Sequence, residues 1–172
     1  MSITDNSPVT EKKDRSSLPD RHVKLLQAAE EVTDNAYQPY DDFVVGAAVL
    51  TSSGNIIKGV NVGNAAFHPS NCAERNALQT METRGQREVE ALAVIGHPPD
   101  AEDSDPVPPC GQCRQVMIEV VQRQGHDFPI YLPELEDGSL ANTVLVSSAE
   151  KLLPLGFGPD DTGKDVSHYL EE

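Results

Sequence analysis

The three cysteines of the chain are spaced so that they could bind one metal ion. Cys110 and Cys113 lie in Pro109-Cys110-Gly111-Gln112-Cys113-Arg114, and Cys72 lies in the distant segment Cys72-Ala73-Glu74-Arg75. Three thiolates can take three corners of a tetrahedral zinc ion and leave the fourth open, which is typical of a catalytic zinc. The pattern therefore predicts a zinc site formed by Cys72, Cys110 and Cys113.

Glu74 follows the isolated cysteine by two residues, so it would stand beside the open zinc position without binding the metal. Zinc lowers the pKa of a bound water from 15.7 toward about 7, and a carboxylate next to that water can carry protons as a catalytic acid and base. The alternative is a capping box, Asn71-x-x-Glu74, in which the carboxylate only bonds the start of a helix. The cysteines favour the catalytic interpretation.

Arg75 and Arg114 are the last residues of the two cysteine segments, and they directly follow Glu74 and Cys113. Three thiolates leave a zinc site electron-rich, so both arginines are predicted to withdraw charge from the sulfurs, with an exposed surface charge as the alternative.

The cysteines are also compatible with two other kinds of site. A structural zinc could take His68 or His97 as its fourth ligand, and a redox pair of the thioredoxin type could use the CxxC segment, although it would not explain the third cysteine.

Further motifs extend the pattern well beyond the cysteines: Ala36-Tyr37-x-Pro39-Tyr40, Phe43-x-x-Gly46-Ala47-Ala48, Gly59-x-Asn61, Asn64-Ala65, and Leu152-Leu153-Pro154 followed by Phe157-Gly158-Pro159. In this order and spacing, over residues 36–159, the chain resembles the cytidine deaminase family, in particular its small homotetrameric branch. The resemblance implies zinc-dependent hydrolysis of cytidine and deoxycytidine to uridine and deoxyuridine with release of ammonia, one zinc ion per chain, and a place in pyrimidine salvage.

The resemblance also implies roles for substrate-binding residues within the chain. Phe43 would stack on the pyrimidine ring, with core packing as the alternative, and Asn61 would bind the sugar. The backbone N–H of Ala73 would meet the base carbonyl, and the carbonyl of Pro108 would accept from the amino group.

Members of this branch complete each active site from neighbouring subunits. The matching positions here are Ala65 and Phe67 in one segment and Phe157 in another, although Phe157 could equally be a local anchor. By this resemblance the protein is expected to be a homotetramer with shared active sites.

One position departs from the family. The family typically has N-x-E-N-A, whose glutamate bonds a ribose hydroxyl, whereas this chain has Asn61-Val62-Gly63-Asn64-Ala65. Losing such a bond costs about 1.5 to 3 kcal/mol. The second hypothesis is therefore an aminohydrolase for a modified or non-ribosyl aminopyrimidine, as in the related blasticidin-S deaminases. A third is a non-catalytic module stabilised by zinc.

The elements that must position these residues follow from hydrophobic periodicity and from Gly and Pro. We expect helices over 20–36, 72–83, 110–125 and 149–153 and strands over 43–51, 56–61, 91–96, 129–132 and 142–146. Two strands followed by strands alternating with helices predict a layered α/β/α domain with a mixed five-stranded sheet. Asn71 is the expected N-cap of the helix that carries Cys72.

The predicted domain covers residues 20–159. Residues 1–19, which contain few large apolar side chains, are expected to form a disordered or loosely attached tail, and residues 160–172 an acidic tail. Residues 97–109 contain five prolines and four acidic residues and are expected to form an exposed loop.

The composition of the chain limits the kinds of molecule that it is expected to bind and the compartment in which it is expected to work. A net charge of −15 repels the phosphates of nucleic acids, so a small nucleoside is expected instead of a nucleic-acid polymer. No apolar run approaches the roughly 20 residues needed to cross a bilayer, and residues 1–20 lack the apolar centre of a signal peptide. Metal-binding thiols indicate a reducing compartment, so the expected location is the cytoplasm, with no membrane partner.

Overall fold

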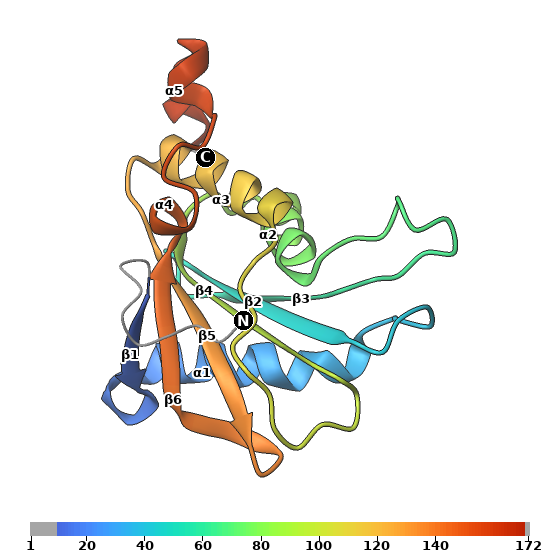
Figure 1. The fold of residues 1–172 in the computed structure, drawn as a ribbon. Helices are drawn as coiled ribbons and strands as arrows, with labels where there is room; N and C mark the ends of the chain where they lie inside the picture. Colours follow the sequence, from blue (N-terminus) through green and yellow to red (C-terminus); the bar gives the residue numbers. More distant parts are fainter. Residues whose placement is uncertain (1–9, 171–172) are drawn as a thin grey trace.

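A mixed sheet of six strands lies at the centre of the computed structural model, which describes residues 10–170 (Figure 1). The strands are β1 (Glu11–Asp14), β2 (Val44–Thr51), β3 (Ile56–Val60), β4 (Val89–His97), β5 (Pro129–Glu136) and β6 (Ser139–Ser148). Their order is β1-β6-β5-β4-β2-β3, in which β4 and β5 are parallel and the other neighbours are antiparallel. The predicted mixed sheet is confirmed.

The sheet has six strands where five were predicted, and the additional strand is β1. Its residues pair with β6 from Glu11 opposite Val146 to Asp14 opposite Thr143, and all four of its side chains are exposed. A strand that pairs with a sheet edge while all its side chains are exposed leaves no hydrophobic pattern in the sequence. The prediction of a loose tail is therefore wrong for residues 11–14, and residues 1–9 lie outside the described part.

Helices cover both faces of the sheet (Figure 1). They are α1 (Asp20–Glu31), α2 (Ala73–Thr83), α3 (Gly111–Gln124), α4 (Ala149–Leu152) and α5 (Pro159–Thr162), with short 3-10 helices η1 (Arg15–Ser17), η2 (Val32–Asn35) and η3 (Ser167–Leu170). Helix α1 lies on one face, and α2 and α3 lie on the other. The layered α/β/α arrangement is confirmed. Within residues 10–170 the structure contains no helix with the length and apolar character needed to span a membrane.

Two apolar cores fill the space between these layers. Along β2, Ala47 and Val49 face the core shared with α2 and α3, whereas Ala48 and Leu50 face the core shared with α1. This alternation follows from the two-residue period of a strand. Both faces of the sheet are therefore buried, which holds the helices that carry the cysteines in fixed positions.

The start of α2 rests directly on β3 because residue 59 is glycine. A Cβ at Gly59 would lie 2.4 Å from the carbonyl oxygen of Ala73 and 2.5 Å from the nitrogen of Ala77. No side chain fits in this gap, so the glycine lets the first turn of α2 approach the strand. The contact fixes the height of Cys72 above the sheet.

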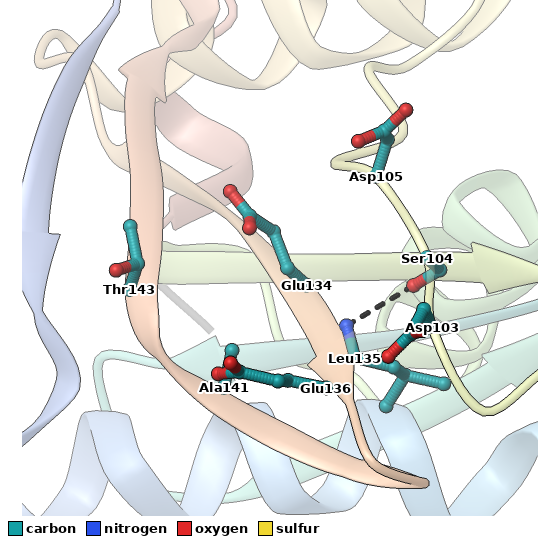
Figure 2. Close-up of a pocket in the computed structure, with 8 residues that line it drawn as sticks. All are labelled: Asp103, Ser104, Asp105, Glu134, Leu135, Glu136, Ala141 and Thr143. Atoms are coloured by element: carbon teal, nitrogen blue, oxygen red, sulfur yellow. Dashed lines mark hydrogen bonds between the residues drawn. The ribbon is translucent and has the colours of Figure 1, made fainter.

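The proline-rich loop after β4 is attached to the sheet, and helix α5 is attached to α3. The proline-rich stretch after β4 is a loop, as predicted, but it bridges to β5, since Ser104 N donates to Leu135 O (3.1 Å) and Leu135 N donates to Ser104 Oγ (3.1 Å; Figure 2). At the other end, Asp160 N donates to Gln122 Oε1 (3.1 Å), which ties the beginning of the predicted acidic tail to α3.

Candidate active site

The three cysteines meet between the N-termini of α2 and α3. The Sγ atoms of Cys72 and Cys110 are 3.8 Å apart, those of Cys110 and Cys113 are 3.6 Å apart, and all three lie within 4.8 Å of one another. Four ligands at about 2.3 Å from a tetrahedral zinc lie roughly 3.8 Å from each other, so the sulfurs fit zinc. Over residues 10–170, no histidine or carboxylate joins this cluster, which leaves one corner of the tetrahedron open.

The two cysteine segments open α2 and α3, whose first backbone N–H groups have no intrahelical partner. Cys72 is the N-cap of α2 and Cys110 is the N-cap of α3, so the predicted cap at Asn71 is wrong by one residue. The pKa of the Cys72 thiol falls to about 5, chiefly because the Cys113 thiol donates a hydrogen bond to its sulfur. The same hydrogen bond is the main cause that raises the pKa of Cys113, with burial next. Hydrogen bonding within the cluster therefore favours the thiolate at Cys72, which is the form that binds zinc, and the thiol at Cys113.

Glu74 lies beside the sulfurs with only 4% of its surface exposed. Burial raises the pKa of its carboxyl group, and the neighbouring Cys72 thiolate raises it further. Because Cys72 is the N-cap of α2, Glu74 is the second helical residue and not the third, and α2 has no side-chain cap hydrogen bond. The capping-box alternative is therefore wrong, and a buried carboxyl group with a raised pKa is suited to carrying a proton.

A cavity of about 240 Å³ opens over this cluster. Its lining residues are Gln38, Val45, Asn61, Ser70, Asn71, Cys72, Ala73, Glu74, Val94, Val107, Pro108 and Cys110. Apolar walls with a few polar groups are typical of small-molecule sites. A larger cavity of about 630 Å³ lies beside Ser104, but its lining has acidic side chains and no cysteine or histidine (Figure 2), so the smaller cavity is the candidate site.

Three of the predicted binding residues, Asn61, Ala73 and Pro108, line the cavity. Asn61 is buried, and its amide is already bonded to the backbone: Oδ1 accepts from Val45 N (2.8 Å) and Nδ2 donates to Phe43 O (2.9 Å). Asn61 therefore holds the beginning of β2 against the cavity, in addition to any contact with a ligand.

The four other predicted binding residues are not in the lining of this cavity. The ring of Phe43 lies against β4, where a Cβ at Gly96 would come within 2.7 Å of it. Phe67 is 72% exposed, on a segment between β3 and α2 that includes Ala65 and extends away from the sheet (Figure 1). Phe157 is 65% exposed, and its carbonyl oxygen accepts from Gln115 Nε2 of α3 (2.5 Å). Within one chain the structure does not place these four residues in the lining of the cavity.

The two arginines differ in what they contact. Arg75 helps to lower the pKa of Cys72 through its charge and a hydrogen bond, and its buried Nε has no hydrogen-bond partner among the described residues. Arg114 instead donates from Nε to Pro109 O (2.7 Å) and from Nη1 to Leu152 O (3.2 Å). Arg75 thus acts on the sulfurs, whereas Arg114 holds the turn before Cys110 against the end of α4.

The sequence did not reveal several wall residues. Val45 and Val94 line the cavity, and the core-facing alternation of β2 and β4 could have placed them near it. Gln38 also lines the cavity, but it is the unspecified position in Ala36-Tyr37-x-Pro39, where neither residue type nor spacing indicates a role.

Comparison with known proteins agrees with this geometry. The family profile described as "Cytidine and deoxycytidylate deaminase zinc-binding region" matches residues 19–124. A cytidine deaminase from Halalkalibacterium halodurans is 39% identical over 137 residues, covering 80% of this chain and 94% of the relative. One from Mycobacterium tuberculosis is 35% identical over 150 residues, covering 86% and 98%.

Solved structures give the same result. The crystal structure of cytidine deaminase from Burkholderia pseudomallei has a TM-score of 0.65 at 39% identity, and the alignment covers 79% of this chain and 98% of that one. The cytidine deaminase of Mycobacterium tuberculosis has a TM-score of 0.60 at 27% identity, covering 82% and 99%. From the cysteine cluster, the matched zinc-binding region and these relatives, it follows that the chain belongs to the cytidine and deoxycytidylate deaminase family.

Proposed function

We propose that the protein hydrolyses cytidine and deoxycytidine: the bond between C4 and the amino nitrogen breaks, water supplies the new oxygen, and uridine or deoxyuridine and ammonia are released. The observation that carries this proposal is the buried Glu74 carboxyl group in one small cavity with the sulfurs of Cys72 and Cys110. The relatives named above, which are cytidine deaminases, support the choice of substrate.

Each residue of the site has a defined task in this proposal. Cys72, Cys110 and Cys113 would hold zinc, which when bound supplies an acidified water as nucleophile. Glu74 delivers a proton to N3 of the ring and then to the departing amino group, and the burial that raises its pKa favours the protonated form. Arg75 withdraws charge from Cys72.

The substrate base is oriented by backbone groups. The N–H of Ala73, in the first turn of α2 and without an intrahelical partner, donates to the base carbonyl, and the carbonyl of Pro108 accepts from the amino group. Val45, Val94 and Val107 form apolar walls that exclude bulk water from the ring. Such fixed groups lower the barrier by orienting the ring before reaction.

The direct test is turnover by the purified, zinc-loaded protein, followed by ultraviolet absorbance. Cytidine and deoxycytidine should both be consumed, with one zinc ion per chain. Failure to turn over either nucleoside would overturn the proposal.

Consumption of blasticidin S or of a free aminopyrimidine in their place would favour the second candidate, an aminohydrolase for a non-ribosyl substrate. That candidate rests on Gly63, which has no side chain to bind a sugar. A zinc-containing protein inactive on every compound would favour the non-catalytic module.

A homotetramer with shared active sites completes the proposal. Phe67 and Phe157 are large and exposed and do not line the cavity of their own chain, as residues that serve a neighbouring subunit would be. Light scattering should give four chains per particle. In a mixture, Glu74→Gln chains can lend their Phe67 to Phe67→Ala chains, so mixed tetramers should be more active than either variant alone. Equal activity would remove the shared-site proposal.

The proposed location is the cytoplasm, because three thiols within 4.8 Å of one another survive best in a reducing compartment.

A further inference from the structure

The segment between η2 and β2 places Gln38 at the wall of the cavity, and two backbone hydrogen bonds hold it there. Tyr37 N donates to Asn61 O (3.2 Å), and Gly63 N donates to Tyr37 O (2.6 Å). The segment is thus attached to the chain that follows β3 on both sides of Val62. Gln38 itself is half-buried and lines the cavity together with Glu74 and Cys72.

Gly63 leaves the space that the Gln38 side chain uses. A Cβ at residue 63 would lie 2.7 Å from Gln38 Oε1 and 3.1 Å from Tyr37 O. Gly63 does not have a positive φ, so its backbone could accommodate another residue. A larger side chain at this position would displace the Gln38 amide.

The Gln38 amide is free to bind a ligand. Among residues 10–170 the amide has no hydrogen-bond partner. Its oxygen and nitrogen are not fully buried, so both remain accessible to a ligand. Neighbouring polar groups of the cavity are already engaged: the Asn61 amide bonds the backbone of β2, the Asn71 amide donates to Asn76, and Ser70 Oγ accepts from Asn64 N (3.1 Å). An amide with a donor and an acceptor both available suits a hydroxyl group, which needs one of each.

We infer that Gln38, admitted by Gly63, is a specificity-determining residue that binds a hydroxyl group of the nucleoside sugar. The inference rests on the proposed function, because it takes a pyrimidine nucleoside as the ligand of the cavity. A neutral amide replaces a charged partner for the sugar, so the cavity retains selectivity for a sugar-bearing base despite the glycine.

The first test is Gln38→Ala, assayed with cytidine, 2′,3′-dideoxycytidine and 5′-deoxycytidine, with competitive inhibition constants where turnover is slow. A neutral hydrogen bond of about 0.5 to 1.5 kcal/mol corresponds to a loss of roughly 2- to 13-fold in kcat/KM for cytidine. The loss should appear in KM while kcat stays within about twofold. It should vanish for the analogue that lacks the bonded hydroxyl. Gln27→Ala, an exposed glutamine on α1, is the control and should change nothing.

The second test uses the space at residue 63. Gly63→Ala should raise KM for cytidine by the same factor as Gln38→Ala, because the new Cβ displaces the amide. The double variant should lose no more than either single variant, since both changes remove one interaction. Melting temperature and zinc content, measured in parallel, separate this effect from misfolding.

The outcomes distinguish the inference from the proposed function. If the unaltered protein deaminates cytidine and Gln38→Ala loses equally on all three substrates, or loses nothing, the inference is overturned while the function stands. If the unaltered protein turns over no cytidine or deoxycytidine, the proposed function itself has failed.

Discussion

Replacing Glu74 with glutamine tests the chemistry of the site most directly. The change keeps the volume of a side chain that is 4% exposed, so packing in the first turn of α2 should persist. It removes the group that can give and take a proton, and catalysis by such a group is typically worth 10² to 10⁴ in rate. Glu74→Gln should therefore lower kcat by at least about 10²-fold, which corresponds to roughly 2.7 kcal/mol in the barrier.

Zinc content should stay at one ion per chain, because the three cysteines, and not Glu74, are the proposed metal ligands. Deamination is followed by ultraviolet absorbance at saturating cytidine, zinc by atomic absorption, and folding by thermal denaturation. Glu119→Gln, an exposed glutamate on α3, serves as the matched control and should keep kcat within about twofold. If Glu74→Gln keeps its zinc and its fold and still works within tenfold of the unaltered protein, Glu74 is not the proton carrier.

Three other changes probe the scaffold. Cys110→Ser should reduce bound zinc below one ion per chain in atomic absorption and lower the melting temperature, because a hydroxyl group is a poor zinc ligand; full zinc occupancy would contradict the three-sulfur site. Gly59→Ala should lower the free energy of unfolding in urea by about 1 to 3 kcal/mol, since its Cβ would lie 2.4 Å from Ala73 O. Unchanged stability would refute the close packing of α2 on β3. Deleting residues 1–14 removes β1 and leaves the edge of β6 unpaired, so light scattering should detect more aggregation at unchanged turnover per folded chain; a deletion that abolishes turnover would give β1 a role in the site.

The sequence alone was sufficient for the metal ligands and for the layered sheet. Zinc accepts few side-chain types, so three cysteines in two motifs define its ligands before any fold is known, and the structure brings their sulfurs within 4.8 Å. The apolar residues of the strands likewise predict buried strands, because successive side chains of one strand face the two opposite cores. These features depend on residue type and local spacing.

Other features depend on contacts between distant segments, and only the tertiary structure decided them. Strand β1 pairs through its backbone with the edge of β6, and its exposed side chains give no sign of this in the sequence. Phe43 lies on Gly96, away from the cavity lining, because of how the chain enters β2. Gln38 becomes a candidate for sugar binding only through the empty space at Gly63, twenty-five residues away in the sequence. A neutral amide carries no signal by itself, since its role comes from the space and the free hydrogen-bonding groups around it.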